Sequence, residues 1–189
     1  MKTPILAENI PSKLSKLLNS LIGRKLERLT CYSWYSEGEA IKEYKISKEE
    51  VFSLTAGPIL IYFEDGLVIG ASSNPSLNSV VIWVEKNEDN DCSDELIEND
   101  NELFPIDAKN QRNFWSCLLG QSIVALNIIK RNTNNPKMTE LPNEVGLFIL
   151  MSNGYKFILS HGLHDNSDDF SVIQEKQINE ELLHQLKNF

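Results

Sequence analysis

The stretch Leu21-Ile22-Gly23-Arg24-Lys25-Leu26 decides the fold, because the sequence repeats it 97 positions later as Leu118-Leu119-Gly120-Gln121-Ser122-Ile123. Each copy is followed by a hairpin signal and then by a Ser-Val pair, Ser79-Val80 in the first half and Ser171-Val172 in the second. This pattern predicts a tandem duplication. Both glycines stand where a glycine commonly ends a helix, so both are expected to have positive φ.

The first unit shows a change of period around Gly23. Before it, leucines recur at helical spacing and predict an amphipathic helix over 12–21; after it, alternation from Leu26 to Trp34 predicts a long strand. Residues 41–46 favour a short edge strand. The segment 59–69, with Asp65-Gly66 in the middle, predicts a β-hairpin closed by a type I′ turn. The apolar run from Val80 to Val84 predicts a central strand covered on both faces.

The second unit predicts the same elements in the same order. These are a helix over 108–119, a strand over 123–129, and a hairpin at Asn153-Gly154 with the same type of turn. A C-terminal helix is expected over 178–186. The fold class is therefore α+β: a duplicated helix–strand–hairpin–strand unit with mainly antiparallel pairing and a pseudo-two-fold relation. The two sheets can either stack or join edge to edge.

The domain limits follow the repeats. Residues 1–85 form the first unit, 86–107 an acidic linker and 108–189 the second unit with its C-terminal helix. Units of this size are marginally stable alone, which favours one compact domain made of both halves. Within the linker, Leu96-Ile97 and Leu103-Phe104-Pro105 are apolar enough to dock on a neighbouring sheet.

Negative charge is concentrated in one segment. The net charge is −9, and the segment from Glu85 to Glu102 contains nine acidic residues and one lysine. Nucleic acid and acidic membranes are therefore not expected as partners. The segment is either a solvated spacer or a docking surface for a basic protein. The candidate partner-binding residues are its acids together with those of a second acidic loop: Glu88, Asp89, Asp91, Asp94, Glu95, Glu98, Asp165, Asp168 and Asp169.

The second acidic loop also holds two histidines, at His161 and His164. With Asp165 they offer the atoms of a divalent metal site, but the spacing fits no known zinc pattern and no further ligand is fixed by the sequence. The competing interpretation is a loop closed by Asx-type hydrogen bonds, in which Asp165 and Asn166 turn the chain. We predict no cofactor and no metal, and keep the metal site as the alternative.

Catalytic signatures are missing from the sequence, which holds no phosphate-binding glycine loop and no nucleophile elbow. Cys31, Cys92 and Cys117 lack CxxC spacing and are expected to be free thiols, with Cys31 and Cys117 in apolar surroundings. Trp34, Trp83 and Trp115 are expected to pack in the core. The run from Tyr32 to Tyr35 is the exception, because its strand continues into a polar loop that could leave an aromatic side chain exposed. An enzyme is not expected.

The size, acidity and duplicated sheet unit of this chain are similar in general character to those of the immunity proteins of bacterial polymorphic and contact-dependent toxin systems. This resemblance rests on no motif and transfers no functional residue. It implies a non-catalytic, cytoplasmic protein that neutralises a basic, nuclease-type toxin by binding it directly. The alternative is a metal-binding or metal-dependent hydrolytic protein that uses His161, His164 and Asp165. No signal peptide or membrane span is expected.

Overall fold

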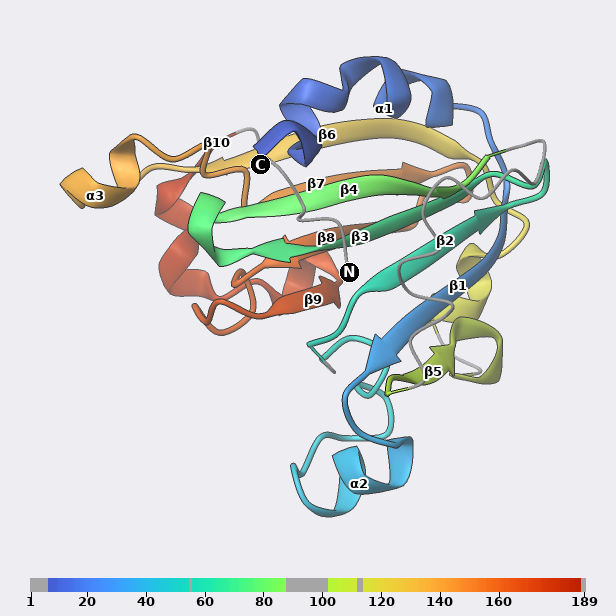
Figure 1. Ribbon diagram of the computed structural model, residues 1–189. Helices are drawn as coiled ribbons and strands as arrows, with labels where there is room; N and C mark the ends of the chain where they lie inside the picture. The colour runs from blue at the N-terminus through green and yellow to red at the C-terminus, as the bar shows by residue number, and fades with distance from the viewer. Residues whose placement is uncertain (1–6, 55, 88–101, 112–113, 188–189) are drawn as a thin grey trace.

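The computed structural model describes residues 7–54, 56–87, 102–111 and 114–187 (Figure 1). They form two antiparallel five-stranded sheets with a few short helices, so the chain is an α+β protein. The sheets have the strand orders β4-β3-β2-β1-β5 and β10-β6-β7-β8-β9. The strands are β1 (Leu26–Ser33), β2 (Ile59–Phe63), β3 (Val68–Asn74), β4 (Ser79–Lys86), β5 (Phe104–Asp107), β6 (Ile123–Arg131), β7 (Gly146–Met151), β8 (Lys156–His161), β9 (Phe170–Ile173) and β10 (Leu186–Lys187).

Helices are short, and several are of the tighter 3₁₀ type. The described helices are η1 (Ala7–Asn9), η2 (Pro11–Leu14), α1 (Ser15–Leu21), α2 (Glu37–Lys42), η3 (Pro75–Leu77), η4 (Ala108–Gln111), η5 (Phe114–Leu118), α3 (Pro136–Thr139), η6 (Glu175–Gln177) and η7 (Glu180–Gln185). The helix expected over 12–21 is present as η2 and α1.

The other two predicted helices are wrong as continuous α-helices. The segment before Gly120 forms the 3₁₀ helices η4 and η5, in which Trp115 and Leu118 are both buried; a spacing of three residues lies on one face of either helix type, so the pattern does not distinguish them. The C-terminal segment forms η6 and η7 and then the short strand β10, which pairs with β6 at the edge of the second sheet.

The two halves repeat the same connections. In each, the strand after Gly23 or Gly120 pairs with a hairpin, and a later segment, β5 or β10, returns to its free side. The half-to-half hydrogen bonds are reciprocal: the amide of Gly23 donates to the Ile123 carbonyl at 2.8 Å, and that of Gly120 to the Leu26 carbonyl at 2.7 Å. These features are what a duplication with a pseudo-two-fold relation predicts, and superposing 12–84 on 108–174 is its direct test.

A β-bulge occurs at the matching place in both halves. The register shifts between Leu26 and Arg28 in β1 and between Ile123 and Ala125 in β6. A bulge moves the following residues to the opposite face of the sheet. For this reason Leu29 points into the core, although regular alternation from Leu26 would place it on the opposite face.

One apolar core is shared by both sheets. It includes Leu29 and Ile61 from the first sheet, Leu147 and Phe157 from the second, and Trp115 from η5. Smaller clusters cover the outer faces: Ile10 and Leu103 pack on the first sheet, and Leu163 and Ile178 on the second. Of the apolar linker residues expected to dock on a sheet, Leu103 does so, Phe104 and Pro105 are exposed in β5, which pairs with β1, and Leu96-Ile97 lies outside the described residues.

Two local predictions of strands are wrong. The run 80–84 lies in β4, which is an edge strand of its sheet, although Val80 and Val81 are both buried because clusters cover its two faces. Residues 41–46 are not a strand, because Ser36 and Glu39 form a capping box that starts α2 instead. In the exit from α2, the chain turns at Lys45, which has a positive φ of 59°.

The hairpin turns differ from the type I′ turns expected. Among the loop residues, only Gly66 and Gly154 have positive φ. Their amides donate to the carbonyls of Phe63 and Met151, which closes three-residue loops with the glycine in the third position. The Asp65 and Asn153 side chains accept hydrogen bonds from the amides two residues later. In each three-residue loop, the glycine is therefore the residue with positive φ.

Gly23 and Gly120 have φ values of 89° and 75°, as predicted. A Cβ at either position meets no atom within 4 Å, so the cost of substitution comes from the backbone alone. Gly23→Val and Gly120→Val should each destabilise the chain by roughly 1 kcal/mol or more in urea unfolding. Gly23→Asn is the matched control and should cost less, because asparagine tolerates this conformation. Valine variants as stable as the wild type would contradict the assignment.

Two further observations concern thiols and membranes. Cys31 is buried and Cys117 is exposed, which corrects the apolar surroundings expected for Cys117; both are free. Burial raises the pKa of the Cys31 thiol well above its usual value. Within the described ranges, no helix has the length and apolar character needed to cross a bilayer.

Candidate functional site

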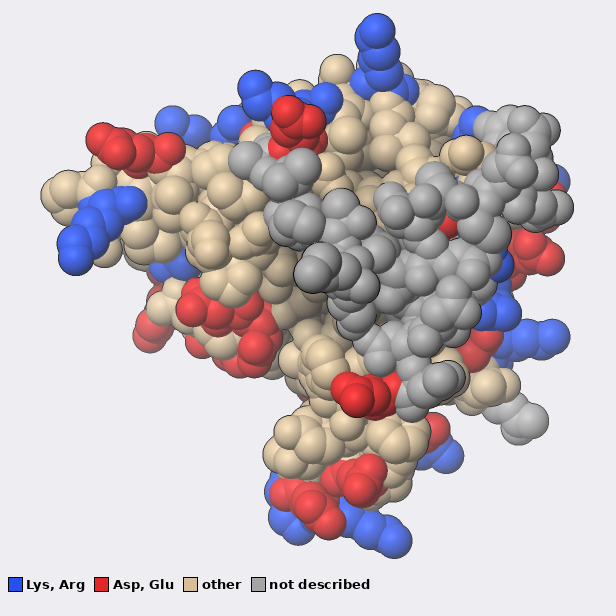
Figure 2. All heavy atoms as spheres, viewed as in Figure 1, with Lys and Arg blue, Asp and Glu red and all other residues tan. Residues whose placement is uncertain are grey.

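The loop between β8 and β9 carries the acidic residues that the sequence placed there. Asp165, Asp168 and Asp169 are exposed, and Figure 2 shows acidic side chains gathered over this part of the molecule. Asp165 accepts a hydrogen bond from the Ser167 amide at 3.0 Å, and the Ser167 hydroxyl accepts one from the Asp169 amide at 3.1 Å. The loop is therefore closed by Asx and Ser turns, as the second interpretation predicted.

The net effect of these contacts on Asp165 is a lowered pKa. Partial burial acts to raise the pKa of this carboxyl, but hydrogen bonds from Ser167 and the nearby charge of His164 act to lower it and prevail. Asp165 is thus ionised at neutral pH. An ionised, exposed carboxylate on this loop is available to a cationic partner.

His161 faces the interior and links the two halves. It is only 3% exposed, and its Nε2 lies 3.1 Å from Asn78 Oδ1. The Asn78 Nδ2 group donates to Asn143 Oδ1 at 2.6 Å, so the Asn78 oxygen is the end that faces the imidazole. We therefore assign the imidazole proton to Nε2. His161 acts as a buried structural group at the junction of the halves.

The alternative metal site is not assembled. His161 lines a cavity of about 260 Å³ with Arg131, whereas His164 and Asp165 line a different cavity of about 160 Å³. The Nδ1 of His164 lies 3.0 Å from the Gln177 carbonyl oxygen. No group of three or more metal-ligating side chains occurs among the residues that the structure describes.

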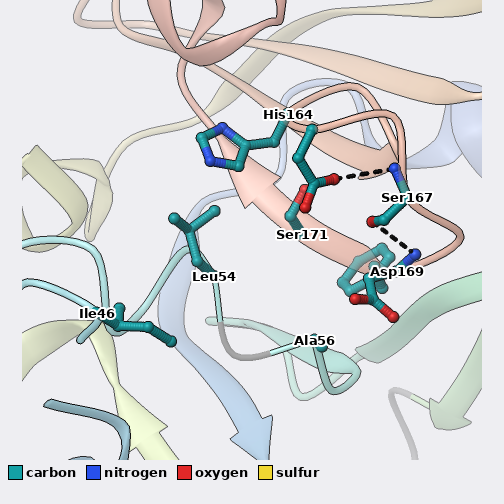
Figure 3. A pocket seen from close by; sticks show the side chains of 9 residues that line it. Ile46, Leu54, Ala56, His164, Ser167, Asp169 and Ser171 are labelled. Atoms are coloured by element: carbon teal, nitrogen blue, oxygen red, sulfur yellow. Dashed lines mark hydrogen bonds between the residues drawn. The ribbon is translucent and has the colours of Figure 1, made fainter. Parts of the chain in front are cut away.

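The smaller cavity lies between the first half and the β8–β9 loop. Figure 3 shows Ile46 and Leu54 on one side of it, and His164 and Ser171 on the other. The wall from the first half is apolar, whereas the other wall combines polar side chains with the Phe170 ring. In this lining the Ser167 hydroxyl accepts a hydrogen bond from the Asp169 amide, and His164 Nδ1 lies against the Gln177 carbonyl oxygen.

The state of His161 predicts a dependence of stability on pH. Burial is the main cause that lowers its pKa below 6.5; the charge of Arg131 adds to this effect, while Asp168 and Asp169 oppose it. Between the folded-state pKa and about 6.5, the unfolded chain binds a proton that the folded chain does not. Stability should therefore fall as the pH decreases below about 6.5, by at most about 1.4 kcal/mol per pH unit from this group.

Urea unfolding of His161→Gln between pH 7 and pH 5 checks this expectation. Glutamine can still donate to Asn78 but does not titrate, so this part of the pH dependence should disappear. The exposed His184 provides the control, and His184→Gln should keep the wild-type slope. A wild-type slope in His161→Gln as well would contradict the assignment.

Only the two ends of the acidic segment from Glu85 to Glu102 lie within the described residues. Glu88, Asp89, Asp91, Asp94, Glu95 and Glu98 lie outside the described residues. At the start of the segment, Glu85 is buried and its carboxylate accepts a hydrogen bond from the Trp83 indole. Glu85 is therefore a structural group, whereas Glu102 at the other end is exposed.

An aromatic surface lies where β1 ends. Trp34 is 52% exposed, Tyr35 42%, Tyr44 50% and Phe104 46%, and we call these four residues the aromatic tip. The rings of Tyr35 and Tyr44 have their centroids 4.2 Å apart. Phe104 is paired in register with Ser33, the residue before Trp34. Exposure of several large aromatic side chains in one place is unusual for a surface without a partner.

Acidic side chains accompany the aromatic tip on helix α2, which projects beyond the end of β1 (Figure 1). Its exposed carboxylates are Glu37 and Glu39, and the exposed Glu43 follows directly after it. The Glu39 carboxylate accepts hydrogen bonds from the Ser36 amide and hydroxyl, which lowers its pKa. Figure 2 shows acidic and basic side chains mixed on this projection. The tip thus combines aromatic faces with nearby negative charge.

The sequence indicated part of this surface. The exposure of Trp34 and Tyr35 matches the exception made for their strand and corrects the general expectation of a buried Trp34; Trp83 and Trp115 are buried, as predicted. Tyr44 and Phe104 were missed as surface residues. Tyr44 was assigned to a strand, and the pairing of β5 with β1, which brings Phe104 to the tip, is not visible in the sequence.

Comparisons with protein-family models, with curated proteins and with solved structures each found no match. Function therefore has to be argued from the residues of this chain.

Proposed function

We propose that this chain is a non-catalytic protein-binding module, an immunity-type inhibitor that neutralises a basic, nuclease-type toxin by binding it in the cytoplasm. The observation that carries the proposal is the aromatic tip. Tryptophan and tyrosine are the residues that most often dominate the energy of a protein interface. Here Trp34, Tyr35 and Tyr44 are exposed, and the Tyr35 and Tyr44 rings contact each other.

Charge supports the choice of a basic partner. The net charge is −9, and exposed carboxylates occur both beside the tip and on the β8–β9 loop. Such charges steer an oppositely charged protein toward the surface and raise its association rate. The aromatic tip then supplies the contacts that hold the complex together.

The test begins with the full chain as bait in its own cells. A captured protein is identified by mass spectrometry and expressed alone, with wild-type chain, or with a Trp34→Ala/Tyr44→Ala variant. We expect a basic protein that stops growth when expressed alone, growth restored by the wild-type chain, and much weaker rescue by the variant. A matched control, Tyr155→Ala, removes an exposed tyrosine on the β7–β8 hairpin and should rescue fully.

Two results would contradict the proposal. One is a captured partner that is harmless when expressed alone, since an inhibitor of a toxin needs a toxic target. The other is equal rescue by the wild-type chain and the tip variant, since the tip would then not be the binding surface.

A further inference from the structure

A polar cavity at the junction of the two halves has the features of a ligand site. Its volume of about 260 Å³ suits a molecule smaller than the drug-sized ligands of ordinary binding pockets. Asn78 lines it from the first half, and residues of the second half close the rest, among them His161, after which we name it the His161 cavity. Two further lining residues, Asn166 and Asp168, are exposed, so the cavity can be reached from solvent.

The buried imidazole of His161 has an unused acceptor atom. The side chain is 3% exposed, and its Nε2 is engaged with Asn78 Oδ1 at 3.1 Å. Its Nδ1 is one of two buried side-chain polar atoms that have no hydrogen-bond partner among the described residues. Since the ring proton is on Nε2, Nδ1 carries a lone pair. Buried polar atoms without a partner are rare, and a ligand with an N–H donor would satisfy this one.

Opposite charges line the same cavity, from Arg131 and Asp168. Both lie close enough to His161 to act on its pKa: burial lowers this pKa most, and in addition Asp168 raises it and Arg131 lowers it. The Arg131 Nε donates to Gln185 Oε1 at 2.9 Å. The Asp168 carboxylate forms no hydrogen bond and no ion pair with any residue that the structure describes. The two charges are therefore not paired with each other, and each can receive an opposite charge from a ligand.

We propose that the His161 cavity binds a free α-amino acid, with its carboxylate against the Arg131 guanidinium and its ammonium between the Asp168 carboxylate and His161 Nδ1. The ammonium supplies the donor that Nδ1 lacks, and the guanidinium matches a carboxylate in shape and charge. A purely anionic ligand would be repelled by Asp168, and a purely cationic one by Arg131. Met138, which also lines the cavity, offers an apolar contact to the side chain of the ligand.

The cavity is lined by none of the residues of the aromatic tip, so the site does not depend on the proposed inhibitor function. A ligand held there contacts both halves through Asn78 and His161 and binds only the folded chain. Its binding should therefore also raise the midpoint of thermal unfolding.

The test is a titration of the full chain with the standard free α-amino acids, one at a time. The ring signal of His161 in ¹H NMR reports binding; the three histidines give three signals, and His161→Gln identifies the one that matters. We expect a saturable shift with at least one amino acid, with a dissociation constant of about 1 mM or tighter. The N-acetyl derivative and the carboxamide of that amino acid each lack one charge and should bind at least about tenfold more weakly.

Variants locate the effect. Asp168→Asn and Arg131→Gln should each weaken binding at least about tenfold, and Arg131→Lys, which keeps the charge, should weaken it less. Asp165→Asn is the matched control: this carboxylate belongs to the same loop but lines the smaller cavity, so binding should be unchanged. Circular dichroism establishes that each variant is folded.

A cavity that holds only water would give no saturable shift with any amino acid, and that result would overturn the proposal. Equal binding of the parent amino acid and its N-acetyl or carboxamide derivative would do the same, because it would show that the two charges are not recognised. So would unchanged binding in a folded Asp168→Asn variant.

Discussion

Replacing both Trp34 and Tyr44 by alanine should weaken binding of the basic partner by at least about 30-fold, mostly through faster dissociation. Truncation of a central aromatic residue typically costs about 2 kcal/mol or more at an interface. Changes of this kind act on the dissociation rate, because they remove contacts that form only after docking. Surface plasmon resonance with the immobilised partner measures both rate constants.

A second variant tests whether the charges of the β8–β9 loop affect the association rate rather than the dissociation rate. Asp165→Asn/Asp168→Asn/Asp169→Asn removes exposed negative charge from the β8–β9 loop without touching the tip. If this loop lies near the docked partner, association should slow at low salt and dissociation should change little. The same triple change in the acidic linker, at Glu88, Asp89 and Asp91, tests whether that segment steers the partner or is a solvated spacer. A tip variant with a wild-type dissociation rate would contradict the role of the aromatic residues.

The substitution Gly57→Ala should destabilise the chain by about 3 kcal/mol. A Cβ at Gly57 would lie 1.5 Å from the Tyr32 carbonyl oxygen, so the backbones of the two segments would have to separate. Such a separation would also strain the 2.8 Å hydrogen bond from the Tyr32 amide to the Pro58 carbonyl. Overpacking of a buried contact typically costs about 1–3 kcal/mol, and a clash with backbone falls at the upper end.

Denaturant unfolding measures this effect, and Gly38→Ala is the control. Gly38 lies in the exposed part of α2 with no atom within 4 Å of an added Cβ. Alanine there should stabilise the chain by up to about 1 kcal/mol through helix propensity. Equal stability of Gly57→Ala and the wild type would show that the approach of the chain to Tyr32 is not as close as the structure has it.

The sequence predicted those parts of the fold that local chemistry determines. Period changes and turn residues within a few positions predicted Gly23, Gly120, the two hairpins and the approximate limits of β1, β4 and β6. The α+β class followed from the order of these elements. The turn type did not, because Asp-Gly fits both a two-residue and a three-residue loop, and the choice depends on which strand residues pair.

Long-range pairing accounts for the rest. The edge position of β4, the return of β5 and β10, and the matched bulges depend on contacts between distant segments. The burial of Val80 and Val81 on opposite faces made an edge strand resemble a central one. Tertiary packing likewise selected 3₁₀ helices where the pattern predicted α-helices, since the pattern places apolar residues but does not fix the helix type.

In the candidate site too, only the locally determined features could be predicted from the sequence. Asp165, Asp168 and Asp169 could be placed in an exposed loop from sequence because turn residues surround them. The burial of His161 could not be predicted, because its hydrogen-bond partner Asn78 is 83 positions away in the sequence. The aromatic tip needed three separate segments to meet, at Trp34-Tyr35, Tyr44 and Phe104, and only the first was visible as a strand that ran into a polar loop.

The most direct test of protein binding at the aromatic tip is ¹⁹F NMR of the chain labelled with 5-fluorotryptophan. Three tryptophans give three signals, which Trp34→Phe and Trp83→Phe assign. Trp34 is exposed and Trp115 is buried in the core shared by the sheets. When the captured basic partner is added, the account predicts a large shift of the Trp34 signal and loss of its solvent exposure, with the Trp115 signal unchanged. A complex that forms at full stoichiometry with an unchanged Trp34 signal would contradict it.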